Sequence, residues 1–180
     1  TTSLVFLTGS GTINLTASQT FYDLTLNVGS SYSLASDIAI THSFKWDAPL
    51  SFSGFEIDNT GGTTDASTDF TSATAGTFTA GNTITCSANW NTVPITYVPN
   101  SAVVTMSGAG KTILTGVGQS IYALIITGTI SQSSILNVTD DWTVSAGSYT
   151  GNSNQMFVGG DVLISGGTLA TVYLNMTGTG

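Results

Sequence analysis

The sequence contains no arginine, and lysine occurs only at Lys45 and Lys111. Its ten acidic residues therefore leave a formal net charge of −8. Binding to nucleic acid depends on basic side chains that release counterions from the phosphates, and attraction to anionic membrane surfaces depends on the same side chains. We therefore expect neither nucleic acid nor an anionic membrane surface among the partners of this chain.

Cysteine and histidine each occur once. Cys86 has no partner for an internal disulfide, and it lies in the alternating segment 83–88, where a small buried side chain is the expected role. A zinc site needs two or more histidine or cysteine ligands, and His42 and Cys86 have no recognisable ligand spacing. The sequence predicts no metal centre of this kind.

Long apolar runs are also absent. The longest extends from Ile121 to Ile126, far short of the ~18 residues of a membrane span, so we expect no membrane insertion. The N-terminus has no basic segment followed by an apolar one, so any secretion signal has been removed or lies upstream. The abundance of Thr, Ser and Gly favours an extracellular or cell-surface location, and so do glycosylation sequons at Asn14, Asn137 and Asn175.

The remaining sequence has the pattern of short strands. Apolar and β-branched residues alternate in short segments separated by Gly, Asn, Asp and Ser, and no segment has the 3.6-residue period of a helix. A β-sandwich needs hairpins, yet the Asn-Gly and Asp-Gly dipeptides of two-residue turns are absent. We therefore predict an all-β fold, and we prefer a parallel β-solenoid of about 20 to 25 residues per coil to the sandwich.

An imperfect repeat supports the solenoid. The segment Val5–Gly11 recurs at Val104–Gly110 and again at Leu174–Gly180. The block Gln19–Leu26 likewise matches Gln119–Ile126, and two further blocks follow in the same order in both copies. Repeats at a spacing too large for a hairpin predict structural units that stack on their neighbours.

The spacing of the blocks suggests a unit of about 70 residues. The interval from Val5 to Val104 is longer than the interval from Val104 to Leu174, and most of the difference lies between Trp46 and Ala75. The first copy thus carries an insertion. We predict a single domain over 1–180, with repeat one at about 4–103, an insertion at about 47–74, repeat two at about 104–173 and the start of a third repeat at 174–180.

Several of these features occur together in a known group of proteins. A short strand followed by Gly-x-Gly, the block that begins at Gln19, and a later strand that ends at Trp142 in the second copy form one recurring pattern. This pattern resembles secreted bacterial and archaeal surface proteins of the adhesin-like group with parallel β-helix repeats. The resemblance covers nearly all of the chain outside the insertion. It implies a right-handed β-helix and extracellular display, and it implies no catalytic residues.

The insertion holds the residues that we favour for binding. Five of the ten acidic residues lie there with phenylalanines between them, and the polar loop 58–65 offers the oxygen ligands that Ca²⁺ takes, without the spacing of an EF-hand. Ca²⁺ is therefore the one cofactor we consider, and an extra coil with a loop is the alternative interpretation. The candidate ligand or ion residues are Asp47, Phe52, Phe55, Glu56, Asp58, Asp65 and Asp69.

Two motifs suggest catalysis but have simpler interpretations. The segment Gly108–Thr112 ends like a phosphate-binding loop, yet Thr105 occupies the position of the first glycine and a strand-like segment follows. Asp140 and Asp141 are neighbours on a predicted strand, so their side chains point to opposite faces, unlike the paired carboxylates of glycosidases. We predict turns at both motifs and no catalytic residue.

Our leading hypothesis is a non-catalytic structural or adhesive repeat segment of an extracellular surface protein or fibre. Its expected partners are flanking repeats of a longer chain or identical subunits stacked head-to-tail, together with surface glycans. The alternative is a polysaccharide-degrading β-helix enzyme, a lyase or glycosidase, which the scarcity of basic residues disfavours. A third hypothesis, ice binding by a threonine-rich face, rests on few Thr-x-Thr pairs. Trp46, Trp90 and Trp142 suggest a sugar-stacking platform, but we favour a place in the core.

Overall fold

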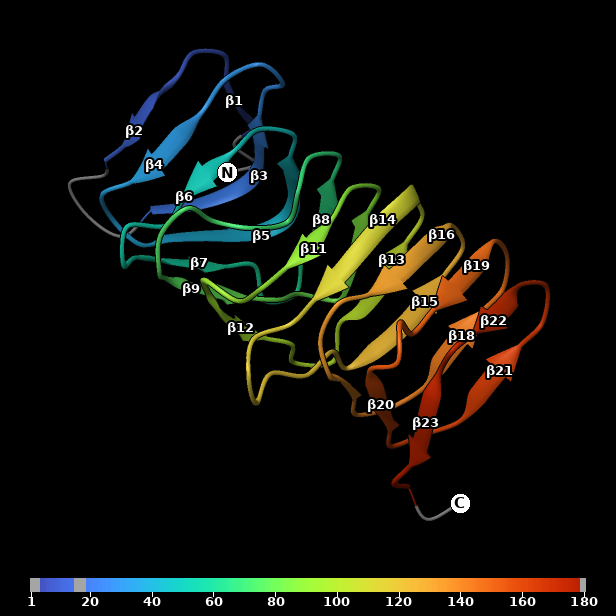
Figure 1. The fold of residues 1–180 in the computed structure, drawn as a ribbon. Coiled ribbons are helices and arrows are strands. Elements are labelled where there is room, and N and C mark those ends of the chain that lie inside the picture. The colour runs from blue at the N-terminus through green and yellow to red at the C-terminus, as the bar shows by residue number, and fades with distance from the viewer. Residues whose placement is uncertain (1–3, 15–18, 179–180) are drawn as a thin grey trace.

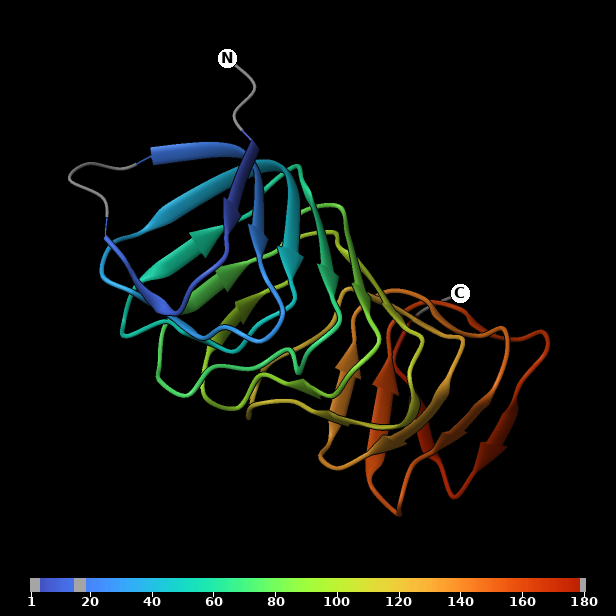
Figure 2. The same ribbon diagram turned by 90° about the horizontal axis from the view of Figure 1, so that it is seen from above.

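The structure is a computed structural model, and it describes residues 4–14 and 19–178. The chain winds as a right-handed parallel β-solenoid of about eight turns, with 54% strand and 0% helix (Figure 1). The solenoid prediction is confirmed, and the sandwich alternative is wrong. The described residues contain no helix that is long and apolar enough to cross a membrane. Seen from above, the first and last coils lie at opposite ends of the stack (Figure 2).

Each coil has three sides, which we call the first, second and third faces. The first face contains β1 (Leu4–Leu7), the end of β3 (Gln19–Leu26), the end of β5 (Ile38–Trp46), β8 (Thr63–Ala66), β10 (Thr83–Cys86), β13 (Val103–Met106), β15 (Ala123–Ile126), β18 (Trp142–Val144) and β21 (Val162–Ile164). The second face contains β2 (Gly11–Ile13), β4 (Tyr32–Leu34), β6 (Leu50–Ser51), β11 (Trp90–Asn91), β14 (Ala109–Leu114), β16 (Thr129–Gln132), β19 (Ser148–Thr150) and β22 (Thr168–Ala170). The third face contains the beginnings of β3 and β5, then β7 (Glu56–Asp58), β9 (Thr77–Thr79), β12 (Thr96–Val98), β17 (Leu136–Val138), β20 (Gln155–Val158) and β23 (Tyr173–Met176).

The ladder of the first face shows how far the chain advances in one turn. Ser43 pairs with Thr63 and Thr63 pairs with Thr83, so one turn takes about 20 residues, at the short end of the range for solenoid repeats. Alternate residues of a strand point to opposite faces of the sheet, so each strand sends one set of side chains inward and the other outward. Because the ladders stay in register, inward side chains of successive coils form continuous columns, such as Ile84 on Val104.

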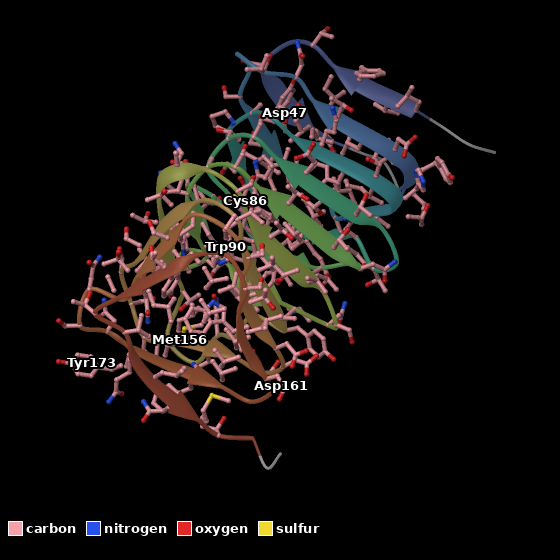
Figure 3. The ribbon with its side chains drawn as sticks, turned by 90° about the vertical axis from the view of Figure 1, so that its right-hand side faces the viewer. Asp47, Cys86, Trp90, Met156, Asp161 and Tyr173 are labelled. Atoms are coloured by element: carbon pink, nitrogen blue, oxygen red, sulfur yellow. The ribbon has the colours of Figure 1, made fainter. Side chains whose placement is uncertain are left out.

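The columns fill the interior with aromatic and aliphatic side chains. Trp46, Trp90 and Trp142 are fully buried, which confirms that they belong to the core and excludes a surface platform. Cys86 is also fully buried, as predicted, and burial raises the pKa of its thiol to about 11. Figure 3 shows Trp90 inside the coils.

One coil takes about 20 residues, which agrees with the predicted coil length, but the predicted unit of about 70 residues is not a whole number of such coils. Val5 and Val104 do lie in one column, because the ladders connect them through five successive pairings. Leu174 instead pairs with Met156 on the third face, because the interval from Val104 to Leu174 is not a whole number of coils. The third block therefore resembles the first in sequence but occupies a different face. Its last residues, 179–180, lie outside the described residues.

The segment 47–74 does not project from the solenoid as a separate insertion. Its strands β6, β7 and β8 pair with strands of the neighbouring coils on all three faces. The segment is thus part of the regular stack, which agrees with the alternative interpretation as an extra coil.

Candidate functional site

The structure distributes the acidic candidate residues over separate parts of the surface. Asp65 lies on the first face, Glu56 and Asp58 lie on the third face, and Asp47 and Asp69 lie at the corner between the first and second faces. The described residues contain no group of three or more His, Cys, Asp or Glu side chains that could hold a metal ion. The seven candidates therefore do not converge on one ion site.

Several of these carboxylates stabilise neighbouring coils instead. Asp47 accepts a hydrogen bond of 2.7 Å from the Ser67 hydroxyl, one coil further along. Glu56 accepts one of 2.8 Å from the Thr79 hydroxyl. These bonds run between adjacent rungs, so the carboxylates satisfy polar groups of the stack.

The two phenylalanine candidates face the interior. Phe52 is fully buried, and Phe55 is partly buried against the same core. A fully buried ring cannot touch a ligand at the surface, so the role of Phe52 is packing, whereas part of the Phe55 side chain stays accessible.

Asp69 differs from the other candidates because it lines a groove. The groove has a volume of about 780 Å³ and lies over β2, β4 and β6 on the second face. The segment 68–73 forms its other wall. Pro49 and Leu50, also from the segment 47–74, contribute to the lining.

A break in the second face produces this groove. The second face consists of a three-stranded sheet, β2-β4-β6, and a five-stranded sheet that begins at β11. The segment between them makes only the single bridges Leu50 to Ser72 and Phe70 to Trp90. Because this segment forms no continuous ladder, it leaves a hollow beside the three-stranded sheet.

Hydroxyl groups dominate the polar surface of the groove. The hydroxyls of Thr12 and Ser33 lie 3.3 Å apart, and those of Ser51 and Thr74 lie 2.7 Å apart. Asp69 accepts two hydrogen bonds of 3.1 Å on one carboxylate oxygen, from the backbone and side-chain nitrogens of Asn89. Within the described part of the chain, no lysine or histidine lines the groove.

The last coil is a second unusual surface. Ile164, Leu174 and Met176 are 41%, 38% and 53% exposed, although they continue the inward columns. Their partners on the preceding coil, Val144, Met156 and Val158, are fully buried. Among the described residues, β21, β22 and β23 each pair on one side only. The coil therefore presents core side chains and free strand edges together.

The polar motifs singled out in the sequence have structural partners. The hydroxyl of Tyr122 donates a hydrogen bond to Asp140, which raises the pKa of Tyr122, and Asp141 accepts one of 2.8 Å from the backbone nitrogen of Asp161. The Nδ1 atom of His42 lies 2.7 Å from a carboxylate oxygen of Asp23. The two adjacent aspartates thus serve separate contacts.

The segment that resembles a phosphate-binding loop forms the bulged start of a strand, β14, which pairs on both sides. The register of β14 shifts between Ala109 and Lys111, and the strand then pairs with β16. The Thr112 hydroxyl donates to the side chain of Asn89 at 3.2 Å. A strand follows the glycines where a phosphate site needs a helix N-terminus, so the segment lacks the structure of that site.

The three sequons differ in accessibility. Asn14 and Asn175 are exposed, whereas Asn137 is half-buried and its side-chain nitrogen donates to the carbonyl of Gln119 at 3.3 Å. Thr16, which completes the first sequon, lies outside the described residues. Glycosylation remains a prediction at all three positions.

Comparisons with protein-family models, curated proteins and solved structures found no match to this chain. The fold therefore defines the class of protein on its own, a parallel β-solenoid.

Proposed function

We propose that the chain is a non-catalytic structural segment that extends an extracellular surface protein or fibre. The observation that carries the proposal is the open last coil. Ile164, Leu174 and Met176 continue the core columns onto the last coil, and among the described residues the strands of this coil pair on one side only. A further coil of the same kind would bury these side chains and pair those edges at once.

The first coil offers a matching surface at the other end of the stack. Among the described residues, β1 pairs only with β3, and β2 pairs only with β4. Val5 and Leu7 continue the inward columns there and are only partly buried. A contact between the last coil of one copy and the first coil of another is heterologous, and such contacts build linear fibres.

Composition supports an extracellular setting. Charged residues make up 7% of the sequence, a single cysteine is present, and the outward positions of the coils are rich in hydroxyls. A surface of this composition is consistent with a solenoid that is displayed in a fibre or at a cell surface.

Sedimentation velocity over a range of concentrations tests the proposal. We expect the chain to associate as its concentration rises, and we expect the double variant Ile164→Lys, Met176→Lys to remain monomeric. Ile135→Lys is the control, because Ile135 is 54% exposed, close to the 53% of Met176, but lies on the side of the coil. A wild-type chain that stays monomeric at all concentrations contradicts the proposal.

A further inference from the structure

The groove on the second face extends along the solenoid axis, because its lining comes from four successive rungs. Thr12 pairs with Ser33 and Ser33 pairs with Ser51, so their hydroxyls form one outward column on three successive rungs. Rungs are spaced about 4.8 Å apart. Thr68, Asp69 and Thr71 belong to the next rung, which the bridge between Leu50 and Ser72 joins to β6, so they lie at one end of this column. The shape suits a short chain-like ligand better than a compact one.

The polar groups of the groove can both donate and accept hydrogen bonds. Each hydroxyl of Thr12, Ser33 and Ser51 has one hydrogen and two lone pairs, which exceeds the bonds that it makes within the protein. Asp69 uses one carboxylate oxygen for Asn89, and a carboxylate has about four acceptor positions. A ligand that carries many hydroxyls matches such a surface, because each of its groups can also donate and accept.

Charge restricts the ligand further. The lining residues include Asp69 and no basic side chain, and the whole chain carries a net charge of −8. Lys45 and Lys111 lie on β5 and β14, outside the groove. Phosphorylated ligands and uronic-acid chains would therefore meet repulsion without a compensating cation.

Apolar groups provide the remaining part of the lining. Pro49 and Ala73 are exposed, and Leu50 lies beneath them. Sugar rings present C–H groups as well as hydroxyls, so a mixed apolar and hydroxyl surface is complementary to them. The volume of about 780 Å³ lies within the range of pockets for small ligands. From these observations we propose that the groove binds a neutral oligosaccharide.

Isothermal titration calorimetry with cellohexaose, xylohexaose and mannohexaose tests the proposal, with trigalacturonic acid as the anionic comparison. We expect at least one of the neutral hexasaccharides to bind and trigalacturonic acid not to bind. Ser33→Trp removes a hydroxyl from the middle of the groove and fills the space there with a large ring. We expect this change to weaken sugar binding by at least about tenfold. Ser131→Trp is the matched control, because Ser131 occupies an outward position of β16 on the same face outside the groove.

A second variant separates a local effect from misfolding. Asp69→Asn keeps the shape of the side chain but replaces one carboxylate oxygen, an acceptor, with an amide nitrogen, a donor. We expect this variant to bind the neutral sugar more weakly and to unfold at nearly the same temperature as the wild type. Binding of none of the neutral hexasaccharides overturns the proposal, and so does equal binding by wild type and Ser33→Trp. Sedimentation velocity measures self-association separately, so a failure of sugar binding is distinguished from a failure of the structural role proposed above.

Discussion

The rings of Phe70 and Trp90 stack face to face inside the solenoid, with centroids 4.2 Å apart and planes inclined by 2°. The two residues lie on successive coils and form one of the two isolated backbone bridges where the second face is interrupted. Both are fully buried. Aromatic packing thus joins two coils at the point where the strand ladder is weakest.

We therefore expect Trp90→Ala to destabilise the fold strongly. Deletion of a buried tryptophan leaves a cavity and typically costs about 3–5 kcal/mol in the free energy of unfolding. Trp90→Phe should cost much less, because it keeps a ring against Phe70 and removes an indole N–H that has no partner. Urea unfolding monitored by circular dichroism measures both, with Val93→Ala at an exposed position as the control. Equal losses for the two Trp90 variants would contradict this account.

Two buried tyrosines provide a matched pair for the hydrogen bonds of the core. The Tyr149 hydroxyl donates to the side-chain oxygen of buried Gln132 at 3.0 Å, whereas the Tyr97 hydroxyl has no partner. Tyr149→Phe leaves the Gln132 oxygen unpaired and should cost about 1–3 kcal/mol. Tyr97→Phe should be neutral or stabilising. Chemical unfolding of the two variants compares their losses in the free energy of unfolding. A larger loss for Tyr97→Phe than for Tyr149→Phe would refute this prediction.

Close backbone contact makes one corner glycine indispensable. A Cβ on Gly128 would overlap the carbonyl of Gly108 on the preceding coil, whereas a Cβ on Gly9 would meet no atom within 4 Å. We expect Gly128→Ala to cost about 1–3 kcal/mol through overpacking. Gly9→Ala should leave the unfolding temperature nearly unchanged. Differential scanning calorimetry of both variants tests this, and equal shifts would show that the corner is not tightly packed.

Burial of Cys86 predicts a specific pH dependence. Burial raises the pKa of the thiol from 9.0 to about 11 in the folded chain. The unfolded chain therefore releases this proton at lower pH than the folded chain, so the contribution of Cys86 to stability is complete below pH 9.0 and falls as pH rises toward 11. The difference in unfolding free energy between wild type and Cys86→Ala should shrink over that window.

The same burial predicts slow chemistry at the thiol. At about pH 8 we expect a thiol reagent to modify Cys86 only when the chain unfolds, because the folded thiol is inaccessible and protonated. Labelling in urea supplies the control for full reactivity. Rapid labelling of the folded chain would contradict the buried position.

Fold class followed from the sequence because alternation and turn residues are local signals. The coil length of about 20 residues lies at the lower end of the predicted range, whereas the unit of about 70 residues does not match a whole number of coils. A small polar residue follows the first-face strands at evenly spaced positions, which are Asp47, Ser67, Ser87, Ser107 and Thr127. The residue that precedes this position varies from Trp46 to Ala66 because large and small side chains fill the core together, and this variation hides the period.

The groove had no local signal in the sequence. Asp69 was a candidate because acidic residues gather near it, but Thr12 and Ser33 reach the same groove only through ladder pairing. Such pairing depends on the number of residues in every intervening coil. The sequence of one chain does not reveal that register, so a surface assembled from several coils is seen only in the folded structure.

Hydrogen exchange at two protein concentrations tests the proposed joint most directly. If the last coil accepts a further coil, the amides of β21, β22 and β23 should become protected as concentration rises, together with those of β1 and β2. Amides of the central strands β9 and β13 should exchange at the same rate throughout, because each of these strands pairs with a neighbour on both sides. Unchanged exchange in β21, β22 and β23 at concentrations that fully occupy the joint in sedimentation would contradict the claim that this coil is built to be extended.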